Sequence, residues 1–298
     1  MSAKVLQRIR HYISIIEKLR IRSDKILQGM FAGMHRSPYL GYTADFEDHR
    51  QYNPGDNIKL IDWPLWARSE KLFIKRFKED TNANVYLILD STLSMAYPSE
   101  DRNKLDRAKE LLILLFLLFR SQNDRVALFR FNEGGKFIVA PNDAKIEKSS
   151  FIEKIAAIEA ERGGDFAEAM KVFSRSAKRR GIVVLASDFI FDTDTLKKGL
   201  NILNYHKHDI LCFHMYAEKE VDAGLLKEGV YFDPEARAKS VSADESGLRN
   251  YRENFLKREI EIREIFNELR IKRIKSFAED NMLKFILGFS AEYSPWNF

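Results

Sequence analysis

Buried-strand and helix patterns alternate along the chain from residue 84 onward, and this alternation sets the fold class. Short apolar runs typical of buried strands occur at Val85–Asp90, Arg125–Phe131, Lys136–Ala140, Ile182–Ser187 and Asp209–Tyr216. Segments with helical periodicity separate them, at Arg102–Ser121, Lys145–Ile158, Phe166–Lys178 and Thr195–His206. Because parallel strands are joined by helical crossovers, the pattern predicts an α/β fold with a doubly wound, mainly parallel, Rossmann-like sheet covered on both faces. The pair Gly134-Gly135 favours an antiparallel edge strand at Lys136–Ala140.

Four parts are predicted along the chain. Residues 1–30 form a basic amino-terminal helix, and residues 31–82 form a β-rich ribbon. Residues 83–217 form the α/β domain, and residues 218–298 add a polar excursion, a long helix and a final strand that pack on it. The helix and the ribbon are therefore expected as additions to one doubly wound domain.

The ribbon is expected from its turn residues and aromatic side chains. Asn53–Asp56 (Asn-Pro-Gly-Asp) is a tight-turn sequence, because proline presets one dihedral and glycine accepts positive φ. Strands are predicted on either side of a short bend, at Ile58–Trp63 and Leu72–Phe77. Trp63 and Trp66 are expected in the core of this ribbon.

The carboxyl-terminal part contains three expected elements. A hairpin is predicted around Val230–Pro234, and a charge-laced helix over Leu248–Phe277. The apolar run Met282–Leu287 is predicted to return as the last strand of the sheet.

Composition favours a cytoplasmic protein. The single cysteine, Cys212, has no partner for an internal disulfide, which suits a reducing compartment. The first residues lack the uninterrupted apolar core of a secretion signal. The longest apolar run, Leu111–Phe119, is about half of the roughly 20 residues that span a bilayer. We therefore expect no transmembrane segment and a helix buried against the sheet.

The positive charge is concentrated at the amino terminus. Residues 1–30 carry seven Lys and Arg against two acidic residues, which equals the whole formal charge of +5. A basic amphipathic helix can bind nucleic acid or an anionic surface, and the alternative is a solvated helix face that packs by its apolar side. No recognised nucleic-acid motif accompanies it, so nucleic acid is not the expected partner.

A candidate metal site follows the strand Val85–Asp90. Asp90, Thr92 and Ser94 place a carboxylate and two hydroxyls where this strand gives way to a loop, and oxygen donors are what Mg²⁺ prefers. Ligands bind an open parallel sheet at the carboxyl ends of its strands. Two other such junctions supply Asp188 and Asp165. The three loops can converge at one edge, although such residues also commonly cap helices.

An enzymatic reading remains as an alternative. Asp90 and Asp188 with a bound cation are suited to a metal-dependent phosphohydrolase. Against it, the chain lacks the Asp-x-Asp pattern of aspartyl phosphatases, a Gly-x-Ser-x-Gly elbow and a phosphate loop. A zinc site at His206, His208 and His214 lacks thiol partners. We therefore expect a binding protein rather than an enzyme.

An ordered set of motifs across residues 33–95 resembles a known bacterial family. The motifs are Gly33–Ser37, Asp45–Asp56, Ile61–Arg68, Phe77–Asp80 and Leu89–Met95, with weaker matches at Gly163–Asp165, Ser187–Phe189 and Phe232–Glu235. The family is domain-of-unknown-function family fifty-eight, whose members contain a von Willebrand factor A-like domain. The resemblance implies that fold, and with it a metal-ion-dependent adhesion site of the Asp-x-Ser-x-Ser type.

This resemblance also implies ligands and partners. Asp90, Thr92 and Ser94 would occupy the three motif positions, and Asp188 would be the acidic residue of the later loop. The middle loop departs from the family pattern, because Gly163-Gly164-Asp165 lacks the usual threonine, so either Asp165 substitutes or Mg²⁺ (or Mn²⁺) binds weakly. The family typically accompanies MoxR-type AAA+ ATPases, which implies an adaptor or cochaperone that binds such an ATPase or its client.

Overall fold

The structure is a computed structural model that describes most of the chain. The described residues are 26, 30, 44–54, 56, 61–69, 71–79, 83–98, 102–143, 146–221, 230–232, 240–242 and 245–289. The predicted amino-terminal helix therefore lies almost entirely outside the described residues, as does much of the predicted strand Ile58–Trp63.

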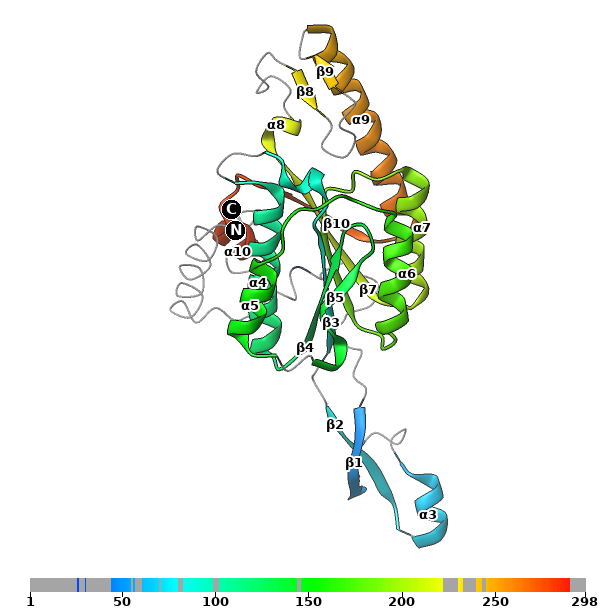
Figure 1. The fold of residues 1–298 in the computed structure, drawn as a ribbon. Coiled ribbons are helices and arrows are strands. Elements are labelled where there is room, and N and C mark those ends of the chain that lie inside the picture. Colours follow the sequence, from blue (N-terminus) through cyan, green and yellow to red (C-terminus); the bar gives the residue numbers. More distant parts are fainter. Residues whose placement is uncertain are drawn as a thin grey trace, which may run out of the picture.

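A six-stranded sheet forms the centre of the molecule (Figure 1). Its strands are β3 (Asn84–Asp90), β4 (Arg125–Phe131), β5 (Lys136–Val139), β6 (Ile182–Ser187), β7 (Asp209–Tyr216) and β10 (Lys272–Phe277). The order is β10-β7-β6-β3-β4-β5, and only the β4–β5 pair is antiparallel. The predicted doubly wound, mainly parallel sheet with an antiparallel edge is confirmed.

Helices cover both faces of this sheet (Figure 1). On one face lie α4 (Lys104–Ser121), α5 (Lys148–Ala156) and α10 (Met282–Leu287), and on the other lie α6 (Phe166–Ser176), α7 (Thr193–Tyr205) and the end of α9 (Glu245–Glu268). Alternate residues of β3 enter the two cores, since Leu87 packs beneath α4 whereas Ile88 packs beneath α6. Short 3₁₀ turns follow β3 and β5, at Leu93–Ala96 and Pro141–Asp143.

The carboxyl-terminal predictions were wrong about which segment forms the last strand. Met282–Leu287 is the helix α10, because the Asn281 side chain caps it by accepting a hydrogen bond from the Lys284 amide at 3.0 Å. The last strand is instead β10, which pairs in parallel with β7. The predicted helix over Leu248–Phe277 ends earlier, at Glu268, and Arg270 (φ 54°) turns the chain into β10.

A second, two-stranded sheet projects from the body as an arm (Figure 1). It pairs β1 (Ala44–Gln51) with β2 (Phe73–Glu79), and the helix α3 (Trp63–Ser69) lies beside them. The side chains of Trp63 and Trp66 are 56% and 45% exposed, so their predicted place in a core was wrong. The Asp62 side chain caps α3 by accepting a hydrogen bond from the Leu65 amide. Trp63, which was predicted to end a strand, therefore lies in the first turn of a helix.

A small hairpin extends the body beyond β7. It pairs β8 (Val230–Phe232) with β9 (Ser240–Ser242), which confirms the hairpin predicted there, and α8 (Glu218–Val221) precedes it. Within the described part of the chain, none of the helices has the length and apolar character needed to cross a membrane.

The buried histidine at the start of β7 makes stability depend on pH. Burial beside Tyr86 and Phe173 lowers the pKa of His208 from 6.5 to about 4. Between pH 6.5 and pH 4, His208 is protonated in the unfolded chain but remains neutral in the folded protein. The contribution of the neutral imidazole to folding stability is therefore full above pH 6.5 and is lost as the pH falls toward 4. We expect wild type to lose about 2 kcal/mol through this group between pH 7 and pH 5.

Urea unfolding at these two pH values, on wild type and His208→Gln, measures this contribution. The variant should lose less stability on acidification, because glutamine does not titrate. Equal losses in the two proteins would show that His208 is protonated as readily in the folded state as in the unfolded one.

Candidate functional site

The switch point of the sheet lies between β3 and β6. These neighbouring strands pair in parallel, and the helices that follow them, α4 and α7, cover opposite faces. The chain therefore diverges from their carboxyl ends in two directions, and this is the position at which open α/β sheets bind ligands. Asp90 ends β3, and Asp188 directly follows β6.

The loop after β3 brings the three predicted motif residues together. The Asp90 carboxylate accepts a hydrogen bond from the Thr92 amide at 2.9 Å, and the Thr92 and Ser94 hydroxyl oxygens lie 3.0 Å apart. All three residues are buried. Because Ser94 belongs to the 3₁₀ turn after β3, the turn holds its hydroxyl over the strand end.

The carboxylate of Asp90 is fully buried and is bonded to neutral groups. Its second oxygen accepts a hydrogen bond from the Ser187 hydroxyl at 2.5 Å, and within the described residues no lysine or arginine pairs with it. Burial, and next the nearby charge of Asp188, raise the pKa of Asp90 to about 7. Burial therefore favours the neutral carboxyl group of Asp90, and a cation bound beside it would favour the carboxylate.

Asp188 has a cationic partner, Lys104, that was not predicted from the sequence. The Lys104 ammonium donates to the Asp188 carboxylate at 2.8 Å and to the Glu220 carboxylate at 2.5 Å. Burial opposes the charge of Lys104, but the two carboxylates outweigh it and hold the pKa of this lysine above its ordinary value. The position of Lys104 in the first turn of α4 opposes the helix dipole, but nothing in the sequence identifies Asp188 or Glu220 as its partners.

A second set of contacts fixes the backbone at Asp188. A ring nitrogen of His214 lies 2.9 Å from the Asp188 carbonyl oxygen, and the other lies 2.9 Å from the Tyr216 hydroxyl. Burial lowers the pKa of His214 to about 3, so the ring is neutral. Because a carbonyl oxygen only accepts, the ring proton lies on Nε2, which donates to the Asp188 carbonyl, and β7 thereby supports the loop after β6.

The predicted middle-loop residue has a structural role of its own. Asp165 is exposed and caps α6 by accepting a hydrogen bond from the Glu168 amide at 3.0 Å. The same loop contacts the first one at another point, where the Glu161 amide donates to the Ser91 carbonyl at 2.8 Å. The structure thus brings together Asp90, Thr92, Ser94 and Asp188. The hydrogen bond of the Asp165 carboxylate caps helix α6 instead.

These residues partly fit a divalent cation. Asp90 offers a buried, uncompensated carboxylate beside two hydroxyls, which are ligands for Mg²⁺ or Mn²⁺. Asp188 is already bonded to Lys104, and within the described residues no three His, Cys, Asp or Glu side chains converge as a metal-binding group. The fit therefore rests on the first loop.

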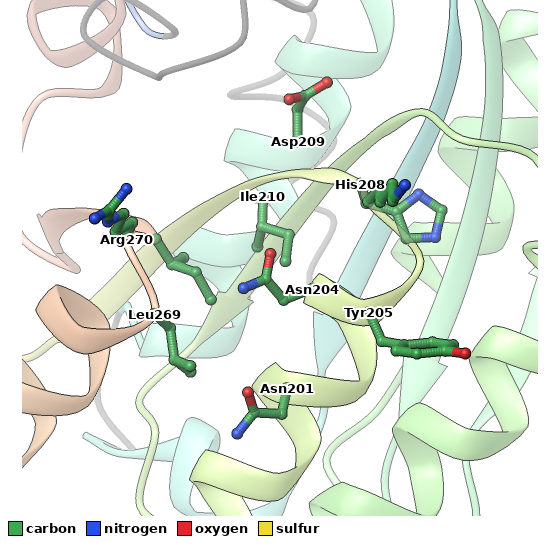
Figure 2. A pocket seen from close by; sticks show the side chains of 10 residues that line it. Asn201, Asn204, Tyr205, His208, Asp209, Ile210, Leu269 and Arg270 are labelled. Atoms are coloured by element: carbon green, nitrogen blue, oxygen red, sulfur yellow. The ribbon is translucent and has the colours of Figure 1, made fainter.

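A separate hollow lies at the opposite edge of the sheet, near the start of β7 (Figure 2). Its volume is about 630 Å³, and Asn201, Asn204 and Arg270 are among the residues that line it. None of the predicted site residues lines it.

Several known proteins are similar to this chain in sequence or structure. The uncharacterized proteins Rv1480 of Mycobacterium tuberculosis and Mb1516 of Mycobacterium bovis are each 22% identical over 224 residues, covering 74% of this chain and 70% of the relative. The crystal structure of the conserved hypothetical protein BatB from Bacteroides thetaiotaomicron is 16% identical, with a TM-score of 0.43, covering 72% of this chain and 98% of that one. The VWA domain of SpRpn10 is 8% identical, with a TM-score of 0.41, covering 70% and 96%.

The central sheet is mainly parallel, with helices on both faces. The model of a protein family of unknown function, DUF58, matches residues 48–264, which is most of the chain. The protein therefore belongs to the DUF58 family.

Proposed function

We propose that this protein is a non-catalytic protein-interaction module that binds its partner at the carboxyl edge of the central sheet. The observation that carries the proposal is the convergence of Asp90, Thr92, Ser94 and Asp188 at the switch point between β3 and β6. Asp90 is a buried carboxyl group there that no lysine or arginine of the described residues neutralises, and a cation bound beside it would favour its ionised form.

A divalent cation, Mg²⁺ or Mn²⁺, is part of this proposal. Asp90, Thr92 and Ser94 would hold it, with Asp188 and Asp165 as further candidate ligands from the other loops. Such an ion would supply a positive charge with positions left for a carboxylate of the partner. A charge-assisted contact of this kind favours specificity over a large buried area.

The rim of the site presents apolar surface that suits a protein partner. Ile190, Val221 and Leu256 are 59%, 44% and 61% exposed. Arg258 of α9 donates to the Phe189 carbonyl at 3.2 Å, which holds this part of α9 beside the loop after Asp188. A hollow of about 330 Å³ lies between α8 and α9 and is lined by Val221 and Leu256 together with Glu220. Exposed apolar patches are typical of protein interaction sites.

The partner class follows from the family resemblance. A MoxR-type AAA+ ATPase, or its client protein, is the partner we propose, with this protein as adaptor or cochaperone. The binding partner's acidic side chain would complete the coordination of the ion at Asp90.

Replacing Asp90 by asparagine should weaken binding to the MoxR-type ATPase about 30-fold or more, equivalent to roughly 2 kcal/mol. The amide keeps the size of the side chain but removes the charge that would hold the cation. The measurement is biolayer interferometry with the purified ATPase, in millimolar Mg²⁺ and again with chelator. Wild type in chelator should bind as weakly as the variant does in Mg²⁺.

Asp124→Asn is the matched control. Asp124 is also a buried aspartate with a pKa raised by burial to about 7, but it lies at the opposite edge, where it accepts a hydrogen bond from the Ala83 amide at 2.9 Å. Its variant should bind like wild type. ATPase binding that is unchanged by chelation of Mg²⁺ and by Asp90→Asn would refute the proposal. Turnover of a phosphate ester by wild type, abolished in Asp90→Asn, would show that the site is hydrolytic.

A further inference from the structure

Lys104 joins two of the carboxylates at the sheet edge. Its side chain is 0% exposed, and its ammonium bridges the Asp188 and Glu220 carboxylates, whose side chains are 2% and 15% exposed. The bridge connects the start of α4, the loop after β6 and the short helix α8. A lysine buried this deeply needs compensating anions, and this one has two.

The charges at the edge are therefore divided unequally. Of the three carboxylates there, Asp188 and Glu220 share the ammonium, whereas Asp90 is bonded to neutral donors. The other oxygen of Asp188 accepts a hydrogen bond from the Ile190 amide at 3.2 Å. Both oxygens of Asp188 are thus engaged, and an ion at Asp90 that recruited this carboxylate would have to share its charge with the Lys104 ammonium.

We infer that Lys104 is a tethered cation that competes with the divalent ion for Asp188 and keeps the metal affinity of the free protein low. This inference rests on the proposed function, because it concerns the regulation of the same site. The divalent ion and the ammonium are alternative neutralisers of one carboxylate, so each weakens the binding of the other.

Glu220 gives the displaced ammonium a place to remain. Because Lys104 already donates to Glu220, losing Asp188 leaves the ammonium with one carboxylate partner rather than none. Glu220 lies on α8 and lines the hollow between α8 and α9, whose rim includes the exposed Val221 and Leu256. A partner that contacts this rim therefore also contacts the surroundings of Glu220, the residue that retains the Lys104 ammonium. Partner binding is in this way coupled to the release of Asp188 from Lys104.

Titration calorimetry with Mn²⁺ tests the inference on the full chain. Lys104→Met removes the ammonium and keeps an unbranched side chain of similar length, so we expect Mn²⁺ to bind at least about tenfold more tightly than to wild type. Lys109→Met is the matched control, since Lys109 is a buried lysine of the same helix that donates to the Ala156 carbonyl at 3.4 Å and not to a carboxylate. Its affinity for Mn²⁺ should equal that of wild type.

A second variant covers the case in which Lys104→Met does not fold. Lys104→Met/Glu220→Gln removes the ammonium together with one of the two carboxylates that it would leave unpaired, and should also bind Mn²⁺ at least about tenfold more tightly. Adding Asp90→Asn to whichever variant folds should abolish the binding, which places the ion at this site.

The outcomes separate the inference from the proposed function. Equal Mn²⁺ affinity in wild type and the lysine variants, lost in Asp90→Asn, would overturn competition by Lys104 and leave the metal site standing. Weaker binding in the lysine variants would overturn it as well, because Lys104 would then support the ion. No saturable binding in any folded variant would overturn both the competition and the metal dependence of the proposed function.

Discussion

Replacing Phe173 by alanine is expected to lower the free energy of unfolding by about 3–5 kcal/mol. The ring is fully buried between α6 and the sheet. It meets Tyr86 edge-on with centroids 5.5 Å apart, meets Phe129 edge-on at 5.4 Å and stacks on Phe137 at 5.6 Å. Alanine would leave a cavity among three aromatic rings on β3, β4 and β5, and rings held by strands cannot collapse to fill it.

Urea unfolding of Phe173→Ala measures this loss, and Val172→Ala is its control. Val172 is the preceding residue of α6 and is only half-buried at the edge of the same cluster, so its truncation should cost about 1 kcal/mol. A loss for Phe173→Ala no larger than that of Val172→Ala would show that the sheet closes over the space.

The central strands could be predicted from the sequence because burial on both faces leaves one continuous apolar run. Ile182–Ser187 and Asp209–Tyr216 begin and end as predicted. The same reasoning failed at Met282–Leu287, because a six-residue apolar run fits a strand and a buried helix equally well. The cap at Asn281 decided between them, and a cap depends on backbone geometry that composition does not reveal.

The candidate site divides in the same way. Asp90 and Asp188 were predictable because each follows a strand pattern, and parallel strands place their carboxyl ends at one edge. Lys104 and Glu220 were not, because their contacts depend on how α4 and α8 pack, with 84 residues separating Lys104 from Asp188 and 116 separating it from Glu220. The exposure of Trp63 also escaped prediction, because aromatic content does not indicate which side of a small arm faces solvent.

Lys104→Met should lower the free energy of unfolding by about 3–5 kcal/mol in metal-free buffer. The variant leaves Asp188 and Glu220 buried without their shared ammonium, and removing one partner of a buried ion pair is costly because the remaining charge stays desolvated. Lys104→Met/Glu220→Gln should recover roughly 1–2 kcal/mol of this loss, because one of the two uncompensated charges is gone.

Adding Mn²⁺ should distinguish a structural lysine from a competing one. A ligand that binds the folded state stabilises it in proportion to RT ln(1 + [L]/Kd), so the variant that binds Mn²⁺ more tightly gains more stability at the same concentration. At millimolar Mn²⁺ we therefore expect urea unfolding to show Lys104→Met recovering more stability than wild type gains. If Lys104 were only structural, Mn²⁺ would shift both proteins equally, and the loss in Lys104→Met would stay at its metal-free value. The ion would then be unable to replace the ammonium at Asp188, and the low metal affinity expected of the free protein would need another cause.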